Sequence, residues 1–556
     1  MTDGGALRVR KSLTDLSKKE LEDLMRAWKG IQDLSVNNKD DPNGFFVIGG
    51  YHGEPFRGAG WGNVSYWGGY CNHGNVLFPT WHRAYLLRLE DALRSIPECE
   101  NVTLPFWDEC SQASLDEGIP TALTDEFFVF DNGEKIRNPL RSYKFPREIV
   151  DHIPQDNLPG HHPEDNPNYN GPNYSKPAGY ETVRYPLSGL VGTPEDRKAS
   201  AEHNEPYIKD PNNALEQLNQ NVTTWLKTAP VIKGKPLNGG HILEQYRKCL
   251  NAPNYTVFSN TTSRTEWNDH HAEPVVSLES PHNQIHLAVG GYYPPQTEFS
   301  PDFSPIEGAN GDMGENDTAA LDPIFFFHHC FVDRVFWLWQ KRHGFTKEFD
   351  IMPGYPGTNS VDSQGPTPGT VPNSWLTMAS PLDPFRKIKD GQDQGPYTSR
   401  DCIDVEKLGY TYGPGSLESP AALAAESGRT KTVHVRRINR AGIRGSFLIS
   451  AYVSDPDAPA DKEKRHYLGT EAVLSRWHVE GCANCQRHLE AAAFFSLDRL
   501  QGLAASVNAE RVEVEIHTRD GIHTRDGIKK RGLMVSTPPA PTSPEPPPYG
   551  YDVEVR

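Results

Sequence analysis

Apolar residues recur at helical spacing through much of the chain before residue 412. Residues 14–35 carry one apolar stripe, and Ser17 with Glu20 fits the capping box that begins many helices. A second stripe of leucines follows Pro79, and a further apolar run extends from Pro323 to Trp337. Because proline suits the first turn of a helix, both segments also have favourable starts. The pattern predicts a mainly helical N-terminal region.

The pattern changes to alternation beyond residue 430. Val433 and Val435, and later Phe447 and Ile449, are apolar positions separated by one residue, which is typical of strands. The stretch GPGSLESPAALAAESGR between the two patterns is low in bulky residues and suits a linker. The segment IHTRDG occurs twice in succession, which indicates a local duplication. We expect a helical domain at 1–412, a linker at 413–430, a β-rich domain at 431–535 and a Pro-rich disordered tail at 536–556.

Histidines form the clearest candidate site, because six of them fall into two groups of three. The members are His52, His73 and His82 in the first group, and His282, His286 and one of the pair His328–His329 in the second. No carboxylate motif accompanies either group. Three imidazoles for each metal ion favour copper and leave a coordination position open for oxygen.

Local sequence supports a helix around the first two members of the second group. His282 and His286 are four residues apart, so their rings lie on one helix face. Ser280 is expected to be the N-cap and Pro281 the first helical residue, with Gly290–Gly291 ending the helix. Local periodicity does not choose between His328 and His329. On sequence alone His270 and His271 are competing ligands, but they lack an ordered helical setting.

The motifs FPTWHRAY, SPHNQIH and DPIFFFHHCFVDR resemble those of the type-3 copper proteins, and most closely the fungal tyrosinases (polyphenol oxidases). The resemblance runs from about residue 45 to Tyr412, and a further match continues into the C-terminal region. It implies a mainly α catalytic domain, in which a four-helix bundle holds a dicopper site, followed by a small β-sandwich-like domain. It also implies the ligands of the two copper ions, with His328 as a structural neighbour: His52, His73 and His82 for CuA, and His282, His286 and His329 for CuB.

The same resemblance implies the chemistry. Two Cu(I) ions held by neutral imidazoles can jointly give two electrons to O2, the co-substrate. Monophenols such as L-tyrosine would be hydroxylated to catechols such as L-DOPA, and catechols oxidised to o-quinones, as in melanin biosynthesis. In the family a glutamate and an asparagine hold a water that assists removal of the phenol proton, and Glu279 and Asn283 match them. Phe325 matches the residue above CuA, and Asn316 lies where members vary at the entrance.

Further features are implied only by the resemblance. Cys71 matches a cysteine that forms a thioether with a ligand imidazole, here His73; the alternative is a plain buried thiol. The C-terminal domain is expected to cover the copper entrance, through a side chain of Val473 to Trp477, until a protease removes it. Cys482 and Cys485 match a pair associated with copper delivery, and a redox dithiol is the alternative reading.

Other classes of protein are alternatives to a tyrosinase. A catechol oxidase without monophenolase activity, or an oxygen carrier of the hemocyanin kind, would use the same six histidines. A zinc hydrolase is disfavoured because SPHNQIH lacks the glutamate of HExxH. The net charge of −17 argues against nucleic acid or an anionic membrane as a partner. Without an apolar N-terminal segment or a membrane-spanning run, we expect a cytoplasmic protein. The eight cysteines are scattered and indicate no disulfide scaffold, and the sequence leaves homo-oligomerisation open.

Overall fold

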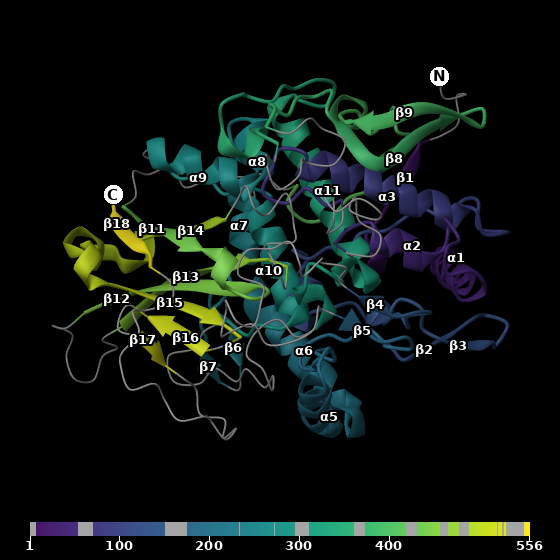
Figure 1. Ribbon diagram of the computed structural model, residues 1–556, viewed down its shortest axis with the longest axis horizontal. Helices are drawn as coiled ribbons and strands as arrows, with labels where there is room; N and C mark the ends of the chain where they lie inside the picture. The colour runs from purple at the N-terminus through teal and green to yellow at the C-terminus, as the bar shows by residue number, and fades with distance from the viewer. Residues whose placement is uncertain are drawn as a thin grey trace, which may run out of the picture.

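The structure is a computed structural model. It describes residues 7–53, 70–150, 175–232, 234–271, 273–294, 311–360, 373–418, 431–455, 465–476, 489–519, 521–524, 527–529 and 550–556. Helices dominate the chain up to about residue 350, and the strands of the C-terminal region gather on one side of them (Figure 1). The mainly helical N-terminal domain and the β-rich C-terminal domain are therefore as predicted.

The α-helices of the described residues are all in the N-terminal domain. They are α1 (Lys18–Asn37), α2 (Phe45–Gly50), α3 (Phe78–Arg94), α4 (Gln112–Glu117), α5 (Pro194–Lys209), α6 (Pro211–Leu226), α7 (Ile242–Cys249), α8 (Tyr255–Ser259), α9 (Thr261–His270), α10 (Glu279–Gly290) and α11 (Ile324–His343). Helix α3 packs against α11, and α10 contacts α6, α7 and α11. These contacts make α3, α10 and α11 the inner helices of the domain.

The helical domain also contains short strand pairs. They are β1 (Arg8–Arg10) with β10 (Tyr410–Tyr412), β2 (Phe127–Val129) with β3 (Lys135–Arg137), β4 (Ile149–Val150) with β5 (Ser175–Lys176), β6 (Val231–Ile232) with β7 (Lys235–Pro236), and β8 (Pro381–Lys389) with β9 (Gln392–Thr398). The pair β1–β10 is parallel, with Arg8 opposite Tyr410. This pairing joins the two ends of the helical domain.

The starts of three helices refine the expectations from sequence. Helix α1 begins at Lys18, later than expected, and Ser17 and Glu20 form the predicted capping box. Helix α10 has Leu278 at its N-cap position, so Ser280 is not the cap. The Ser280 hydroxyl instead donates to Glu471 of the C-terminal domain at 3.0 Å. At α11, which follows Pro323 as expected, the Asp322 carboxylate accepts a bond from the Ile324 N–H at 3.2 Å.

The C-terminal domain is a sandwich of two sheets. One has the order β14 (Glu490–Ser496), β11 (Thr432–Asn439) and β18 (Asp552–Val555). The other has the order β13 (Arg465–Val473), β12 (Phe447–Ser454), β15 (Val512–Thr518), β16 (Gly521–Thr524) and β17 (Gly527–Lys529). Side chains of both sheets, including Val433, Phe495, Ile449 and Val514, share one apolar core. The described residues of the duplicated IHTRDG segment contribute to the antiparallel strands β15, β16 and β17.

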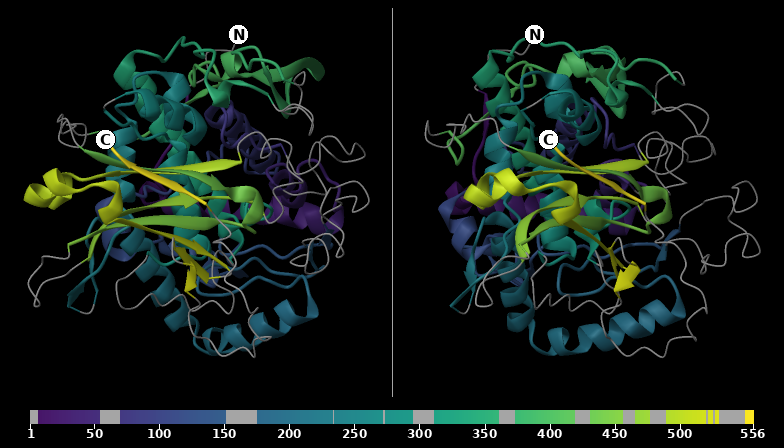
Figure 2. Two further views of the ribbon diagram at one scale, coloured as in Figure 1. Left: turned by 60° about the vertical axis from the view of Figure 1, so that its left-hand side comes forward. Right: turned by 90° about the vertical axis from the view of Figure 1, so that its left-hand side faces the viewer.

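The outer face of the second sheet packs against the helical domain. Along β12, Phe447 and Ile449 face the core of the sandwich, whereas Leu448 belongs to the core of the helical domain, together with Ala472 and Leu474. Alternation of side chains along a strand accounts for this division, and for burial of both faces of β12. Both views of Figure 2 show these strands lying against the teal helices.

Two boundaries differ from those expected. The beginning of the supposed linker is bound to the helical domain, because Ser416 donates its backbone N–H to Asp108 at 2.7 Å and Arg334 donates to the Ser416 carbonyl at 2.8 Å. The end of the supposed disordered tail is strand β18, which pairs with β11 through residues 433–436. Alternating valines at 553 and 555 pack on the sandwich core and explain this strand. No helix in the described part of the chain has the length and apolar character needed to cross a membrane.

Candidate metal centre

Three histidine nitrogens converge between α10 and α11. The Nε2 atom of His282 lies 3.1 Å from that of His286 and 3.2 Å from that of His329, and the last two are 3.3 Å apart. Imidazole nitrogens bound at about 2.0 Å around one tetrahedral metal ion would lie about 3.3 Å from one another. The three rings therefore already have the spacing of a ligand set.

Hydrogen bonds at the opposite ring nitrogens orient two of these rings. The His282 Nδ1 atom is 2.9 Å from the Asn283 amide oxygen, and the His286 Nδ1 atom is 2.7 Å from the Met313 carbonyl oxygen. Since both oxygens are acceptors, Nδ1 carries the proton in each ring. Nε2 is then left as the bare nitrogen that a metal ion binds.

The geometry distinguishes between His328 and His329. The Nδ1 atom of His328 bonds to the carboxylate of Glu109 at 2.5 Å, and its ring stacks on that of His282. His329 instead directs Nε2 toward the other two nitrogens. This arrangement is compatible with the ligand assignment implied by the resemblance, and the ligand atoms of all four histidines lie within 4.8 Å of one another.

The first group of histidines comes from less regular segments. His52 follows α2, His73 lies in the loop before α3, and His82 lies within α3. Their ring centroids are 5.0 to 5.5 Å apart. Both ring nitrogens of His52 and the Nε2 atom of His82 are buried without a hydrogen-bond partner among the described residues. Buried nitrogens of this kind are costly unless a ligand such as a metal ion binds them.

The two groups lie side by side. The rings of His82 and His329 stack with centroids 4.4 Å apart, and those of His73 and His282 are 5.5 Å apart. Burial is the largest cause that lowers the pKa of each of these imidazoles, to about 3 for His82. The rings are therefore neutral near pH 7, as metal binding requires. Two adjacent sets of three neutral imidazoles fit a pair of copper ions.

Further predicted residues surround this cluster. Phe325 is fully buried and stacks on His329 at 3.9 Å between centroids, with its ring also against His52. The Asn316 amide donates to the Cys71 sulfur at 3.6 Å. Ligand atoms of Cys71, His52 and His73 lie within 4.8 Å of one another. These six residues thus belong to one contiguous site.

Glu279 connects the two halves of the site. Its carboxylate accepts the Gly74 N–H at 2.8 Å on one oxygen, and the Thr261 N–H at 2.8 Å and hydroxyl at 3.0 Å on the other. Burial raises the pKa of Glu279, and these three hydrogen bonds act in the opposite direction. The carboxylate therefore ties α10 both to the residue after His73 and to the start of α9.

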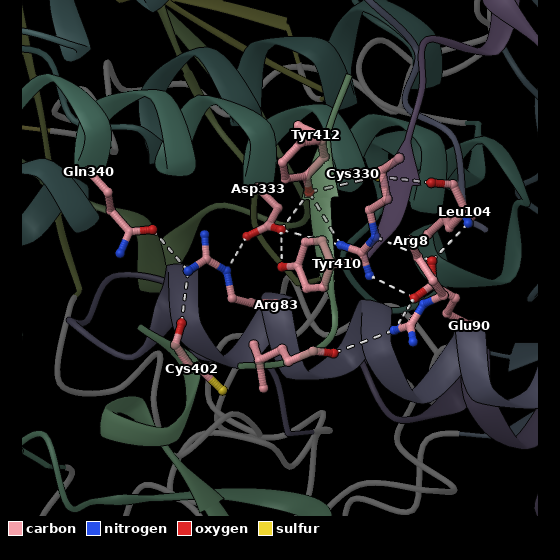
Figure 3. A network of polar contacts seen from close by, with 12 residues as sticks. Arg8, Arg83, Glu90, Leu104, Cys330, Asp333, Gln340, Cys402, Tyr410 and Tyr412 are labelled. Atoms are coloured by element: carbon pink, nitrogen blue, oxygen red, sulfur yellow. Dashed lines mark hydrogen bonds and ion pairs between the residues drawn. The ribbon is translucent and has the colours of Figure 1, made fainter. Parts of the chain in front are cut away.

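A buried ionic network joins α3, α11 and β10 near the site (Figure 3). The Asp333 carboxylate accepts from Arg83 at 2.6 Å, from Tyr410 at 2.8 Å and from Tyr412 at 2.5 Å. Arg83 directly follows His82 in α3, and Asp333 lies one turn after His329 in α11. The network thus fixes the two helices that contribute one ligand each to the neighbouring groups.

Some residues were misjudged or missed from sequence. His270 does lie in a helix, at the end of α9, but it is exposed and bonds to Glu266, while the exposed His271 stacks on Trp267. Exposure, not irregular structure, separates them from the centre. Glu109 was missed, because no local pattern connects it to a histidine so distant in sequence. Cys482, Cys485 and Trp477 lie outside the described residues.

Comparison with known proteins relates this chain to a protein family. The model of the common central domain of tyrosinase matches residues 42–342. A tyrosinase of a Hahella species is 52% identical over 524 residues, which cover 90% of each chain. A tyrosinase of Aspergillus oryzae is 43% identical over 541 residues, covering 92% of this chain and 93% of the relative. The solved structure of a tyrosinase from Burkholderia thailandensis has a TM-score of 0.75 and 47% identity, and covers 92% of this chain and 94% of that one.

Proposed function

This chain belongs to the tyrosinase family of oxidoreductases, and we propose that it is a dicopper monophenol and o-diphenol oxidase kept latent by its C-terminal domain. The substrates would be small phenols, with L-tyrosine and L-DOPA as representatives of the two classes. The observation that carries the proposal is the pair of adjacent three-histidine groups, whose bare nitrogens are buried and neutral.

The histidines would hold one copper ion in each group. His52, His73 and His82 would bind CuA, and His282, His286 and His329 would bind CuB. When bound, the two ions would supply the two electrons that activate O2 for reaction with a phenol ring. Asn283 and Met313 would keep the protons of the CuB imidazoles on Nδ1, so that Nε2 faces the metal.

Glu279 and Asn283 would assist removal of the phenol proton. They stand four residues apart on α10, so both side chains are on one face of the helix. The Asn283 oxygen is occupied by His282, which leaves its amide N–H groups as donors to a water. The Glu279 carboxylate would accept a hydrogen bond from the same water, because each carboxylate oxygen can accept more than one bond. A water held in this way would act as the base for monophenols.

Cys71 would form a thioether with the His73 ring. The Cys71 backbone N–H donates to the His52 carbonyl at 3.0 Å, which holds the segment of Cys71 and His73 beside the first histidine. The link would replace an S–H and a C–H bond by one S–C bond, and O2 would take up the two electrons and two protons. A chain that is lighter by two hydrogen atoms in mass spectrometry would support it, and an unchanged mass would contradict it.

Contacts across the two domains support latency. Arg476 pairs with Asp317 at 3.0 Å, and both side chains are buried. Next to them, the Asn316 N–H donates to the Ser475 carbonyl at 3.4 Å, and the Ser446 hydroxyl donates to the Gly314 carbonyl at 2.8 Å. The segment from Val473 to Arg476 therefore covers the loop whose Asn316 contacts Cys71. Cleavage between residues 418 and 431, followed by removal of the C-terminal fragment, would uncover this side of the site.

The cysteine pair of the C-terminal domain would serve copper delivery. Cys482 and Cys485 would pass Cu(I) to the histidines before the domain is removed. Serine at both positions should lower the rate of copper uptake by the full chain without changing the activity of chains that are already loaded. Equal rates of uptake would contradict this role.

Oxygen uptake with L-tyrosine and L-DOPA tests the main proposal. The copper-loaded protein is assayed as the full chain and as the trimmed chain separated from its C-terminal fragment. We expect activity on both substrates that appears or rises on trimming. Activity on L-DOPA alone would identify a catechol oxidase. Oxygen binding without turnover by either form would identify an oxygen carrier and contradict the proposal.

A further inference from the structure

A buried polar chain lies behind the CuB histidines. The Tyr246 hydroxyl of α7 donates to Glu109 Oε2 at 2.8 Å, and Glu109 Oε1 bonds to His328 Nδ1 of α11 at 2.5 Å. All three side chains are fully buried. None of them belongs to the ligand set, and none would contact the phenol in the proposed reaction.

Main-chain contacts hold Glu109 in register with α11. The Trp107 N–H donates to the Phe327 carbonyl at 3.1 Å, and the Trp107 indole donates to Ser114 at 3.0 Å. Phe327 immediately precedes His328. The carboxylate is therefore fixed relative to the very turn of α11 that carries His328 and His329.

The His328 ring packs against every member of the CuB group. It stacks on His282 with centroids 5.2 Å apart and an interplanar angle of 21°, and it meets His286 edge-on at 5.1 Å and His329 at 5.0 Å. Rotation of this ring would change its stacking on His282. The bond to Glu109 is the hydrogen bond that prevents such a rotation from the side opposite the ligands.

We propose that Glu109 is a positioning residue for the CuB site, which acts by holding the His328 ring against His282. Tyr246 holds the second oxygen of the same carboxylate. Stability alone does not account for this pair, because well-packed apolar side chains usually stabilise a buried position at least as well as an ionisable pair does. Partners that orient ligand rings are known to affect metal affinity by roughly 10–100-fold.

Copper affinity of the apo chain tests this inference, which rests on the proposal that the chain binds copper. Competition with a Cu(I) chelator measures the two binding steps. We expect Glu109→Ala to weaken one step by about 10–100-fold. Glu109→Gln should weaken it less, because the amide oxygen can still accept from His328. In a His52→Ala background, which disables CuA, the same loss should remain.

Trp339→Phe is the matched control. It removes one buried hydrogen bond of α11, from the indole to the Ala252 carbonyl at 2.9 Å, far along the helix from the histidines. Melting of the apo forms shows how far each variant destabilises the fold. We expect the control to lower the melting temperature and to leave both copper affinities unchanged.

The outcomes distinguish failure of this inference from failure of the proposed function. Unchanged affinities in Glu109→Ala, or losses no larger than those of the control, would overturn the positioning role. If Glu109→Ala does not fold, Glu109→Gln and Tyr246→Phe must each weaken the CuB step several-fold, and unchanged affinities in both would overturn it. A wild-type chain that binds no copper would refute the proposed function instead.

Discussion

Replacing Glu279 by glutamine separates two roles of this side chain: holding the catalytic water and accepting structural hydrogen bonds. The carboxylate accepts from two backbone N–H groups on different oxygens, Gly74 at 2.8 Å and Thr261 at 2.8 Å. Glutamine has one oxygen, so one of these N–H groups would face an amide N–H2 group. A buried donor left without a partner costs about 1–3 kcal/mol. Glu279→Gln should therefore lower the free energy of unfolding by about that amount and still fold.

The loss of activity should be larger for one substrate class than for the other. Removing a positioned base typically costs about 10²-fold or more, so kcat/KM for L-tyrosine should fall by about 10²-fold, or about 2.7 kcal/mol. The value for L-DOPA should change by less than about 3-fold, because the proposed base serves the monophenol step. Both are measured by oxygen uptake on trimmed chains with equal copper content.

Thr261→Val is the control for this experiment. It removes the hydroxyl that donates to the same carboxylate at 3.0 Å and keeps the carboxylate. We expect a loss of about 1 kcal/mol in stability and an unchanged ratio of tyrosine to DOPA activity. The reasoning would be refuted if Glu279→Gln left that ratio at its wild-type value, or if Thr261→Val changed the ratio as much.

Three further predictions concern buried ionisable side chains. Asp333→Asn should lower the stability of the apo chain by about 3–5 kcal/mol in thermal or denaturant unfolding, because the fully buried Arg83 would lose its carboxylate; a loss below about 1 kcal/mol would contradict this. Arg476→Ala should raise the phenol oxidase activity of the full chain several-fold by removing its ion pair with the buried Asp317, and an unchanged activity of the full chain would contradict the proposal that this segment covers the site. Burial lowers the pKa of His434 to about 4, so its neutral form stabilises the fold above about pH 6.5. That contribution should be lost between about pH 6.5 and 4, and unfolding midpoints of His434→Gln should vary less with pH.

Features that depend on local sequence were the ones predicted correctly. The apolar stripe of α1 and its capping box are formed by residues within one helix, so periodicity and side-chain type were enough. The same holds for the spacing of His282 and His286, because one helix places both rings. The long histidine motifs also identified the family, whose central-domain model matches residues 42–342.

Features that depend on distant partners could not be predicted. Ser280 looks like an N-cap, but its hydroxyl donates to Glu471, which is 191 positions away in the sequence. Local periodicity did not choose between His328 and His329, although the family resemblance did, because Glu109, the partner of His328, lies 219 positions away in the sequence. The last strand, β18, follows a Pro-rich stretch that suggested disorder, and its backbone pairs with the distant strand β11. In each case tertiary contacts override a local signal.

Anomalous scattering at the copper edge, from crystals of the copper-loaded full chain, tests the central claim most directly. The account predicts two peaks, one within bonding distance of His52, His73 and His82, and one within bonding distance of His282, His286 and His329. His328 should remain bonded to Glu109 and take no part in coordination. A single peak, a peak coordinated by His328, or two peaks elsewhere in the chain would contradict the account.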